Sequence, residues 1–228
     1  MTDKKSYDPY GSNQDDLRTE TGAVPIPRNF FRTELRSDVF NGKVNENHKF
    51  EQFFWTADTV EALIGGLQYV YEEKTCCMTT PSLAHRWHEL GRDEVLLDID
   101  TRFSYLPKFH YFDIRNPTDL EAQSTSGVTQ NILGEAHFRL LVLDPPFFAI
   151  PVEEIRRAVD YLTNGDFSTK IIIAWLLRAE KSLRVAFAPY NLVPTTFELQ
   201  YASVKPNKWK NFVLYSNIDL PGIKRIKE

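Results

Sequence analysis

Short apolar segments typical of buried strands alternate with segments of helical periodicity from about residue 50 onward. The strand-like segments are Thr75–Met78, Val95–Ile99, Phe109–Phe112, Phe138–Leu143, Lys170–Trp175, Thr196–Val204 and Asn211–Tyr215. Most are apolar throughout, which is typical of strands that helices cover on both faces of a parallel sheet. The pattern predicts an α/β fold: a Rossmann-like, seven-stranded sheet, mostly parallel, with a C-terminal antiparallel hairpin.

The helical segments and the tail complete the predicted organisation. Apolar residues recur at helical spacing in four segments: Asp58–Tyr71, Pro81–Leu90, Val152–Leu162 and Ala179–Val185. Residues 1–28 are polar and rich in turn-forming residues, so we expect a disordered tail followed by one domain over residues 29–228. A chain of 228 residues is long enough for a single domain with a large core.

Charge and cysteine content argue against a dedicated nucleic-acid binder and against a disulfide or zinc site. The net charge is −4 and the pI about 5.8, whereas a dedicated nucleic-acid binder usually carries a basic surplus. The two cysteines, Cys76 and Cys77, are adjacent, a spacing that suits neither a disulfide nor a zinc site. With no apolar run of membrane-spanning length, we expect a protein of the cytoplasm or nucleus, without a metal.

The sequence Asp144-Pro145-Pro146-Phe147 directly follows the strongest strand-like segment. In a doubly wound sheet, ligands bind outside the carboxyl ends of the strands. Two prolines stiffen the turn, and we expect their carbonyls to point outward as acceptors. A carboxylate and a carbonyl so placed can orient an amine as positive charge develops on it, and Phe147 can stack on a base or cover a methylene chain. The alternative is a plain strand-to-loop turn.

Further polar residues follow the other strands and suit a nucleoside cofactor such as S-adenosylmethionine. Asp100 ends the second strand, where an acidic residue can bind ribose hydroxyls, and Asp98 is a weaker candidate for the same role. Asp113 ends the third strand and can accept from an adenine amino group. Thr79, Thr80, Pro81 and Ser82 replace a Gly-x-Gly loop near the cofactor's amino-acid carboxylate, although a helix cap explains these residues equally well.

A basic stretch near the C-terminus is a candidate substrate contact. Lys205, Lys208 and Lys210 surround Trp209, a combination that can hold phosphate and stack on a base. The alternative is a solvated loop between the last two strands.

Four motifs in this order resemble the eukaryotic N6-adenine-methyltransferase-like family: Glu51-Gln52-Phe53-Phe54-Trp55-Thr56, Cys77-Met78-Thr79-Thr80-Pro81-Ser82, Leu96-Leu97-Asp98-Ile99-Asp100-Thr101-Arg102-Phe103 and Asp144-Pro145-Pro146-Phe147. The resemblance implies the methyltransferase variant of the Rossmann-like sheet, S-adenosylmethionine as methyl donor and an amino nitrogen as acceptor. It also implies that Gln52, Phe53 and Trp55 help to close over the cofactor or substrate; the alternative is a hydrophobic patch under the next helix.

Two branches of that family differ in substrate. The segments Cys77–Pro81, Leu96–Asp100 and Val213–Ile218 look more like zinc-knuckle methyltransferases of ribosomal RNA adenine. Short length, acidic pI and the lack of zinc modules look more like lysine methyltransferases of elongation factor 1-alpha. The resemblance therefore implies RNA adenine as the first expectation, with lysine in a translation elongation factor as the alternative. A partner protein that supplies substrate affinity and a non-catalytic scaffold are the remaining expectations.

Overall fold

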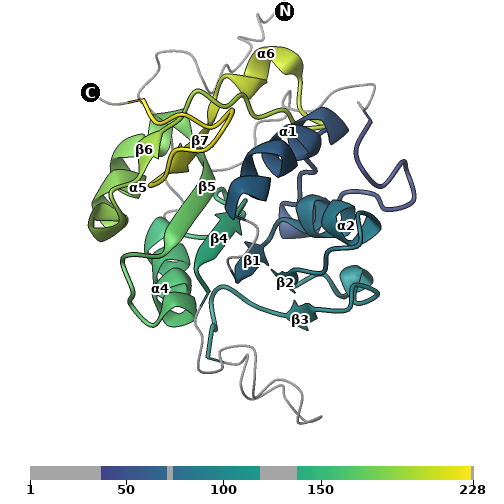
Figure 1. Ribbon diagram of the computed structural model, residues 1–228, viewed down its shortest axis with the longest axis horizontal. Helices are drawn as coiled ribbons and strands as arrows, with labels where there is room; N and C mark the ends of the chain where they lie inside the picture. The colour runs from purple at the N-terminus through teal and green to yellow at the C-terminus, as the bar shows by residue number, and fades with distance from the viewer. Residues whose placement is uncertain (1–36, 71–73, 119–137, 227–228) are drawn as a thin grey trace, which may run out of the picture.

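A seven-stranded sheet forms the centre of the computed structural model, which describes residues 37–70, 74–118 and 138–226 (Figure 1). The strand order is β3-β2-β1-β4-β5-β7-β6. Strands β1 to β5 pair in parallel, whereas β7 is antiparallel to both β5 and β6. The strands are β1 (Thr75–Met78), β2 (Val95–Asp98), β3 (Phe109–Tyr111), β4 (Leu140–Leu143), β5 (Lys170–Leu176), β6 (Val193–Pro194) and β7 (Phe212–Ser216). The predicted fold class is therefore confirmed.

Helices cover both faces of the sheet, with α1 and α2 on one side and α4 and α5 on the other (Figure 1). The α-helices are α1 (Ala57–Leu67), α2 (Pro81–Glu89), α4 (Val152–Thr163), α5 (Glu180–Ala186) and α6 (Pro206–Trp209). Short 3-10 turns lie at η1 (His48–Phe50), η2 (Gln68–Val70), η3 (Thr101–Phe103), η5 (Leu177–Ala179) and η6 (Ala188–Tyr190). All residues of β1, β2 and β4 are buried, because both faces of these strands are covered.

Side-chain and backbone caps end two of the helices. Thr56 caps the N-terminus of α1, where its side chain accepts a hydrogen bond from the Thr59 amide. Helix α4 stops at Asn164, which adopts the left-handed conformation and lets the chain turn toward β5.

The prediction of a strand at Thr196–Val204 was wrong. The edge strand is instead β6, and the segment after it leaves the sheet. Its backbone pairs with the segment before α1: the Thr56 amide donates to the Gln200 carbonyl and the Ala202 amide donates to the Phe54 carbonyl, both at 2.8 Å. Hydrogen bonds with the backbone of Phe54 and Thr56 thus replace those that the segment would make as a strand of the sheet. The next segment, Lys205–Lys210, contains the short helix α6 and is not the loop predicted between the last two strands.

The predicted tail at residues 1–28 lies outside the described residues. Within the described ranges, no helix is long and apolar enough to cross a membrane. The same ranges hold no cluster of three or more His, Cys, Asp or Glu side chains suited to a metal ion.

Candidate active site

One cavity opens at the carboxyl ends of β1, β2, β3 and β4. Because these strands are parallel, the loops that follow them meet at one edge of the sheet. A segment from residues 46–56, here called the strap, forms the opposite wall. The lining residues are Lys49, Phe50, Glu51, Gln52, Phe53, Thr79, Pro81, Asp98, Ile99, Phe112, Asp113, Ile114, Arg115, Asp144, Pro146, Ala149 and Ile150. The cavity therefore gathers residues from five separate stretches of sequence.

The strap is held in place at both of its ends. The Phe54 amide donates to Glu46 Oε1 at 2.7 Å, and the segment around Tyr201 pairs with its far end. Gln52 and Phe53 lie in the cavity wall, whereas Trp55 is 2% exposed and belongs to the core. Of the three strap residues that the sequence resemblance singled out, the structure thus places two at the cavity.

Asp144 reaches the cavity from the end of β4 and is held by a hydrogen bond from Tyr201. The Tyr201 hydroxyl donates to Asp144 Oδ1 at 2.9 Å. Burial raises the pKa of Asp144 to about 8, and the Tyr201 hydroxyl and Trp55 indole act against that rise. The Trp55 Nε1 lies close to this carboxylate without meeting hydrogen-bond geometry to any described residue. Asp144 is therefore a carboxyl group that can hold a proton near neutral pH.

The two prolines after Asp144 differ in the acceptors that they offer. The Pro146 carbonyl accepts from the amides of Ala149 and Ile150 at 3.0 and 2.9 Å. The Pro145 carbonyl accepts from the Phe147 amide at 2.7 Å. A carbonyl oxygen has two lone pairs, so Pro145 retains capacity for a second donor while that of Pro146 is used. The expectation that both carbonyls point outward was wrong for Pro146.

Phe147 points into the core and lies outside the cavity wall. Its side chain is 6% exposed, and its ring packs at centroid distances of 5.0, 5.8 and 5.7 Å from Phe148, Trp175 and Phe212. The expectation that this ring stacks on a substrate is therefore not met in this arrangement. An aromatic residue has more to gain from the core beneath β5 and β7 than from the cavity rim.

The structure brings Asp98, not Asp100, to the cavity wall. Asp98 is the last residue of β2, and its Oδ1 accepts from the Asp100 amide at 2.9 Å. Burial raises the pKa of Asp98 to about 7. Asp100 turns toward the strap, where it pairs with Arg102 at 2.6 Å and accepts from Gln52 at 3.1 Å. Burial opposes its ionisation, but the hydrogen bonds from Arg102 and Gln52 hold the pKa of Asp100 below its ordinary value.

The loops after β1 and β3 contribute further predicted residues. Pro81 and Asp113 line the cavity, whereas Thr80 and Ser82 are 2% and 3% exposed. The Thr80 hydroxyl donates to the Val142 carbonyl at 3.3 Å, so its role is to join β1 to β4. Thr79, the first residue of the same predicted stretch, also lines the cavity and has a φ of 57°. A β-branched residue rarely adopts that conformation, and such strain is concentrated at functional sites.

The basic residues proposed as substrate contacts lie on and beside α6. Lys205, Lys208 and Lys210 are on this short helix or at its ends, away from the cavity wall. Trp209 is partly buried, and its Nε1 donates to the Tyr201 carbonyl at 3.2 Å. This residue thus contacts the segment that holds Asp144, and a direct role in substrate binding stays a prediction.

Comparisons with known proteins identify a family and a relative. A family model described as "Probable N6-adenine methyltransferase" matches residues 46–220. A protein-lysine N-methyltransferase of Dictyostelium discoideum is 23% identical over 162 residues, covering 66% of this chain and 71% of the relative.

Solved structures with a similar chain path are more distant. YhhF of Escherichia coli has a TM-score of 0.40 at 15% identity, covering 84% of this chain and 99% of its own. PH1948 of Pyrococcus horikoshii has a TM-score of 0.42 at 10% identity, covering 86% and 95%. Likeness this distant says nothing about the function of the chain.

Proposed function

Because this chain belongs to the N6-adenine methyltransferase family and is an S-adenosylmethionine-dependent methyltransferase, we propose that it methylates the side-chain amine of a lysine in a protein. The observation that carries the proposal is the Asp144 carboxyl group, which lines the cavity and accepts a hydrogen bond from the Tyr201 hydroxyl at 2.9 Å; its burial raises its pKa. The Dictyostelium relative that is described as a protein-lysine N-methyltransferase supports the same choice.

The cavity residues fit the cofactor by their chemistry. Asp98 offers a carboxylate for ribose hydroxyls and Asp113 offers one for an adenine amino group. Ile99 and Ile114 supply apolar walls of the kind that an adenine ring needs. Thr79 and Pro81 lie after β1, at the start of helix α2, whose positive dipole end would favour a carboxylate. We assign these residues to cofactor binding.

A lysine acceptor needs a group that can take a proton. The ammonium of lysine has an ordinary pKa near 10.4, so it reaches the enzyme charged and cannot attack until it loses a proton. The ionised form of Asp144 can accept that proton directly or through water, and its share grows as the pH rises toward the pKa of about 8. An adenine amino group arrives neutral and needs only acceptors, which a carboxyl of ordinary pKa would provide as well.

The packing of Phe147 counts against a base as the substrate. Phe147, the residue that would stack on a base, is packed in the core. With Asp98 and Asp113 assigned to the cofactor, Glu51 and Asp144 are balanced by Lys49 and Arg115 at the cavity wall, so the charge of the wall does not choose between the two substrates. The position of Phe147 favours a lysine over a flipped-out adenine.

When bound, S-adenosylmethionine would supply the methyl group of its sulfonium: the S–CH3 bond would break as the N–CH3 bond forms, and sulfur would be left as a neutral thioether. Asp144, which lines the cavity, would accept one hydrogen of the amine, so that the nitrogen lone pair can turn toward the methyl group. The Pro145 carbonyl keeps a free lone pair, but Pro145 does not line the cavity. Asp144 would take the ammonium proton before the attack and pass it to solvent through the cavity; the methylated amine would form as an ammonium and could leave the site charged.

RNA adenine is the second candidate. The description of the matching family model favours it, and so does the basic stretch at Lys205–Lys210. In that case Phe147 would have to leave the aromatic cluster that now surrounds it.

The discriminating experiment offers total protein and total RNA, separately, to the purified enzyme with methyl-labelled cofactor. Both samples come from cells that lack the gene, so that unmethylated sites are available. We expect label in protein, on lysine, with elongation factor 1-alpha as the first candidate from the sequence resemblance. Asp144→Asn should abolish the label, whereas Asp160→Asn on the outer side of α4 should not. Label in RNA adenine and none in protein would overturn the proposal in favour of the second candidate.

A further inference from the structure

Contacts with three separate elements hold the Tyr201 side chain and backbone in place. It is 1% exposed, and its ring centroid lies 4.8 Å from Phe212 and 6.4 Å from Phe53 in the cavity wall. Its backbone bridges to Trp55 of the strap, and its carbonyl accepts from the Trp209 indole. The strap, β7 and α6 therefore fix the position of its ring together.

The hydroxyl of this anchored ring ends at the catalytic carboxylate, 2.9 Å from Asp144 Oδ1. We propose that Tyr201 is the positioning residue of the reaction: its hydroxyl occupies Asp144 Oδ1 with a hydrogen bond, and Asp144 Oδ2 is left to face the amine. The inference rests on the proposed role of Asp144. A carboxylate free to rotate would present either oxygen, and the angle between nitrogen lone pair and methyl group would vary with it.

Tyr201 also sets the charge of Asp144. Burial raises the pKa of Tyr201 far above its ordinary value, so the hydroxyl is a donor throughout the physiological range. A hydrogen bond to the ionised carboxylate stabilises the charged form and opposes burial. Glu46 on the strap acts in the reverse direction through its charge. The other charged or titratable groups at this cavity are Lys49, Glu51, Asp98, Asp113 and Arg115.

The charge on Asp144 can be measured through cofactor binding, without turnover. S-adenosylmethionine carries a sulfonium that an ionised Asp144 attracts, whereas S-adenosylhomocysteine is neutral at sulfur. The two molecules share their amino-acid and nucleoside groups, so the ratio of their dissociation constants reports the sulfonium. Isothermal titration calorimetry from pH 6 to 10 should show the ratio turning in favour of S-adenosylmethionine as Asp144 ionises.

We expect Tyr201→Phe to move that transition upward by about 1 to 2 pH units, because the lost hydrogen bond favoured the ionised carboxylate. The rising limb of the pH–rate profile should move by the same amount, and the rate at pH 7 should fall about 10-fold or more. The substitution keeps the ring and its packing, and thermal melting checks that the variant is folded.

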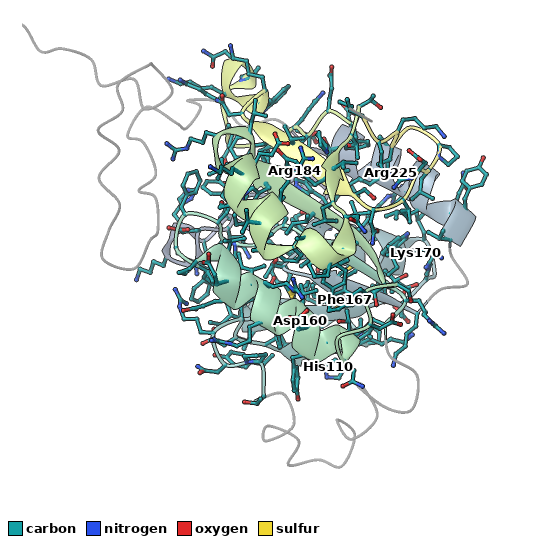
Figure 2. The ribbon with its side chains drawn as sticks, turned by 90° about the vertical axis from the view of Figure 1, so that its left-hand side faces the viewer. His110, Asp160, Phe167, Lys170, Arg184 and Arg225 are labelled. Carbon is teal, nitrogen blue, oxygen red and sulfur yellow. The ribbon has the colours of Figure 1, made fainter. Side chains whose placement is uncertain are left out.

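Tyr190→Phe is the matched control. Tyr190 is also 1% exposed, and its hydroxyl lies 2.9 Å from the Thr163 hydroxyl and donates to Asp160 at 3.2 Å. Asp160 lies on α4, on the side of the sheet that α4 and α5 cover (Figure 2). This variant loses the same kind of hydrogen bond, but the bond does not involve Asp144. The pH at which its binding ratio changes should therefore equal that of wild type.

Asp144→Asn separates the inference from the proposed function. If this variant keeps the pH-dependent ratio, Asp144 does not face the sulfonium and the proposed role of Asp144 fails. If it loses the dependence while Tyr201→Phe matches wild type in both measurements, only the inference about Tyr201 is refuted. A loss of melting temperature in Tyr201→Phe, with unchanged pH transitions, would likewise reduce Tyr201 to a packing residue.

Discussion

Replacing Asp144 by Asn should stabilise the cofactor-free protein, and the gain should grow with pH. Between its ordinary pKa of 3.8 and the folded value of about 8, the folded state holds a proton that the unfolded state has released. Over that window, the stability contributed by Asp144 is lost as the pH rises. Asparagine keeps the shape of the side chain and carries no charge, so the loss disappears.

The size of the effect follows from the two pKa values. A difference of about 4 pH units corresponds to about 5 kcal/mol in the free energy of unfolding at pH 8, as an upper bound. Because Asp144 borders a cavity that water can enter, we expect about 2 kcal/mol more gain at pH 8 than at pH 5. For a domain of this size, that gain is about 4–8 °C in melting temperature.

The assay is thermal unfolding of wild type and Asp144→Asn at pH 5 and pH 8, without cofactor. Asp160→Asn is the control, since the Asp160 carboxylate pairs with Arg156 at 2.7 Å outside the cavity. It should show no gain on raising the pH. If Asp144→Asn gains no more at pH 8 than at pH 5, the carboxyl is not buried enough to hold a proton, and its role as proton acceptor loses its basis.

Three further substitutions test other parts of the structure. Asp98→Asn keeps the acceptor for the Asp100 amide but removes the charge, and calorimetry should show S-adenosylhomocysteine binding weakened about 10- to 100-fold; unchanged affinity would remove Asp98 from the ribose site. Phe147→Leu should lower the free energy of unfolding by about 1–2 kcal/mol in a denaturant titration while leaving the KM for a protein substrate unchanged, and a large rise in KM would place this ring at the substrate after all. Gly66→Ala should cost about 1–3 kcal/mol in the same titration, because a Cβ there would lie 2.8 Å from the Pro221 carbonyl oxygen; a neutral result would mean that the segment beside α1 yields easily.

Several elements were predictable because their signals are local. Strand β1 has the bounds that its apolar run predicts, and α4 begins at the predicted Val152 and ends one residue beyond the predicted Leu162. Local signals failed at Thr196–Val204, whose residues favour a strand but whose backbone pairs with the strap. Strand propensity says that a segment prefers to be extended and not which neighbour it pairs with.

Some residues of the candidate site were likewise predictable from local signals, and others were not. The sequence determined which residues follow the strands, and parallel strands bring such residues to one edge, so Pro81, Asp113 and Asp144 meet at the cavity as expected. Distinguishing Asp98 from Asp100 required the structure, although the last residue of a strand was the signal to weigh more heavily.

The sequence by itself determined the fold class, the family and the position of the Asp144 motif, because periodicity and short motifs are encoded in neighbouring residues. Only the tertiary structure decided that Phe147 turns into the core and that Tyr201 holds Asp144 across 57 positions of sequence. Side-chain direction and burial depend on the neighbours that distant segments provide. The same burial sets the pKa of Asp144, and with it the chemistry that the cavity can perform.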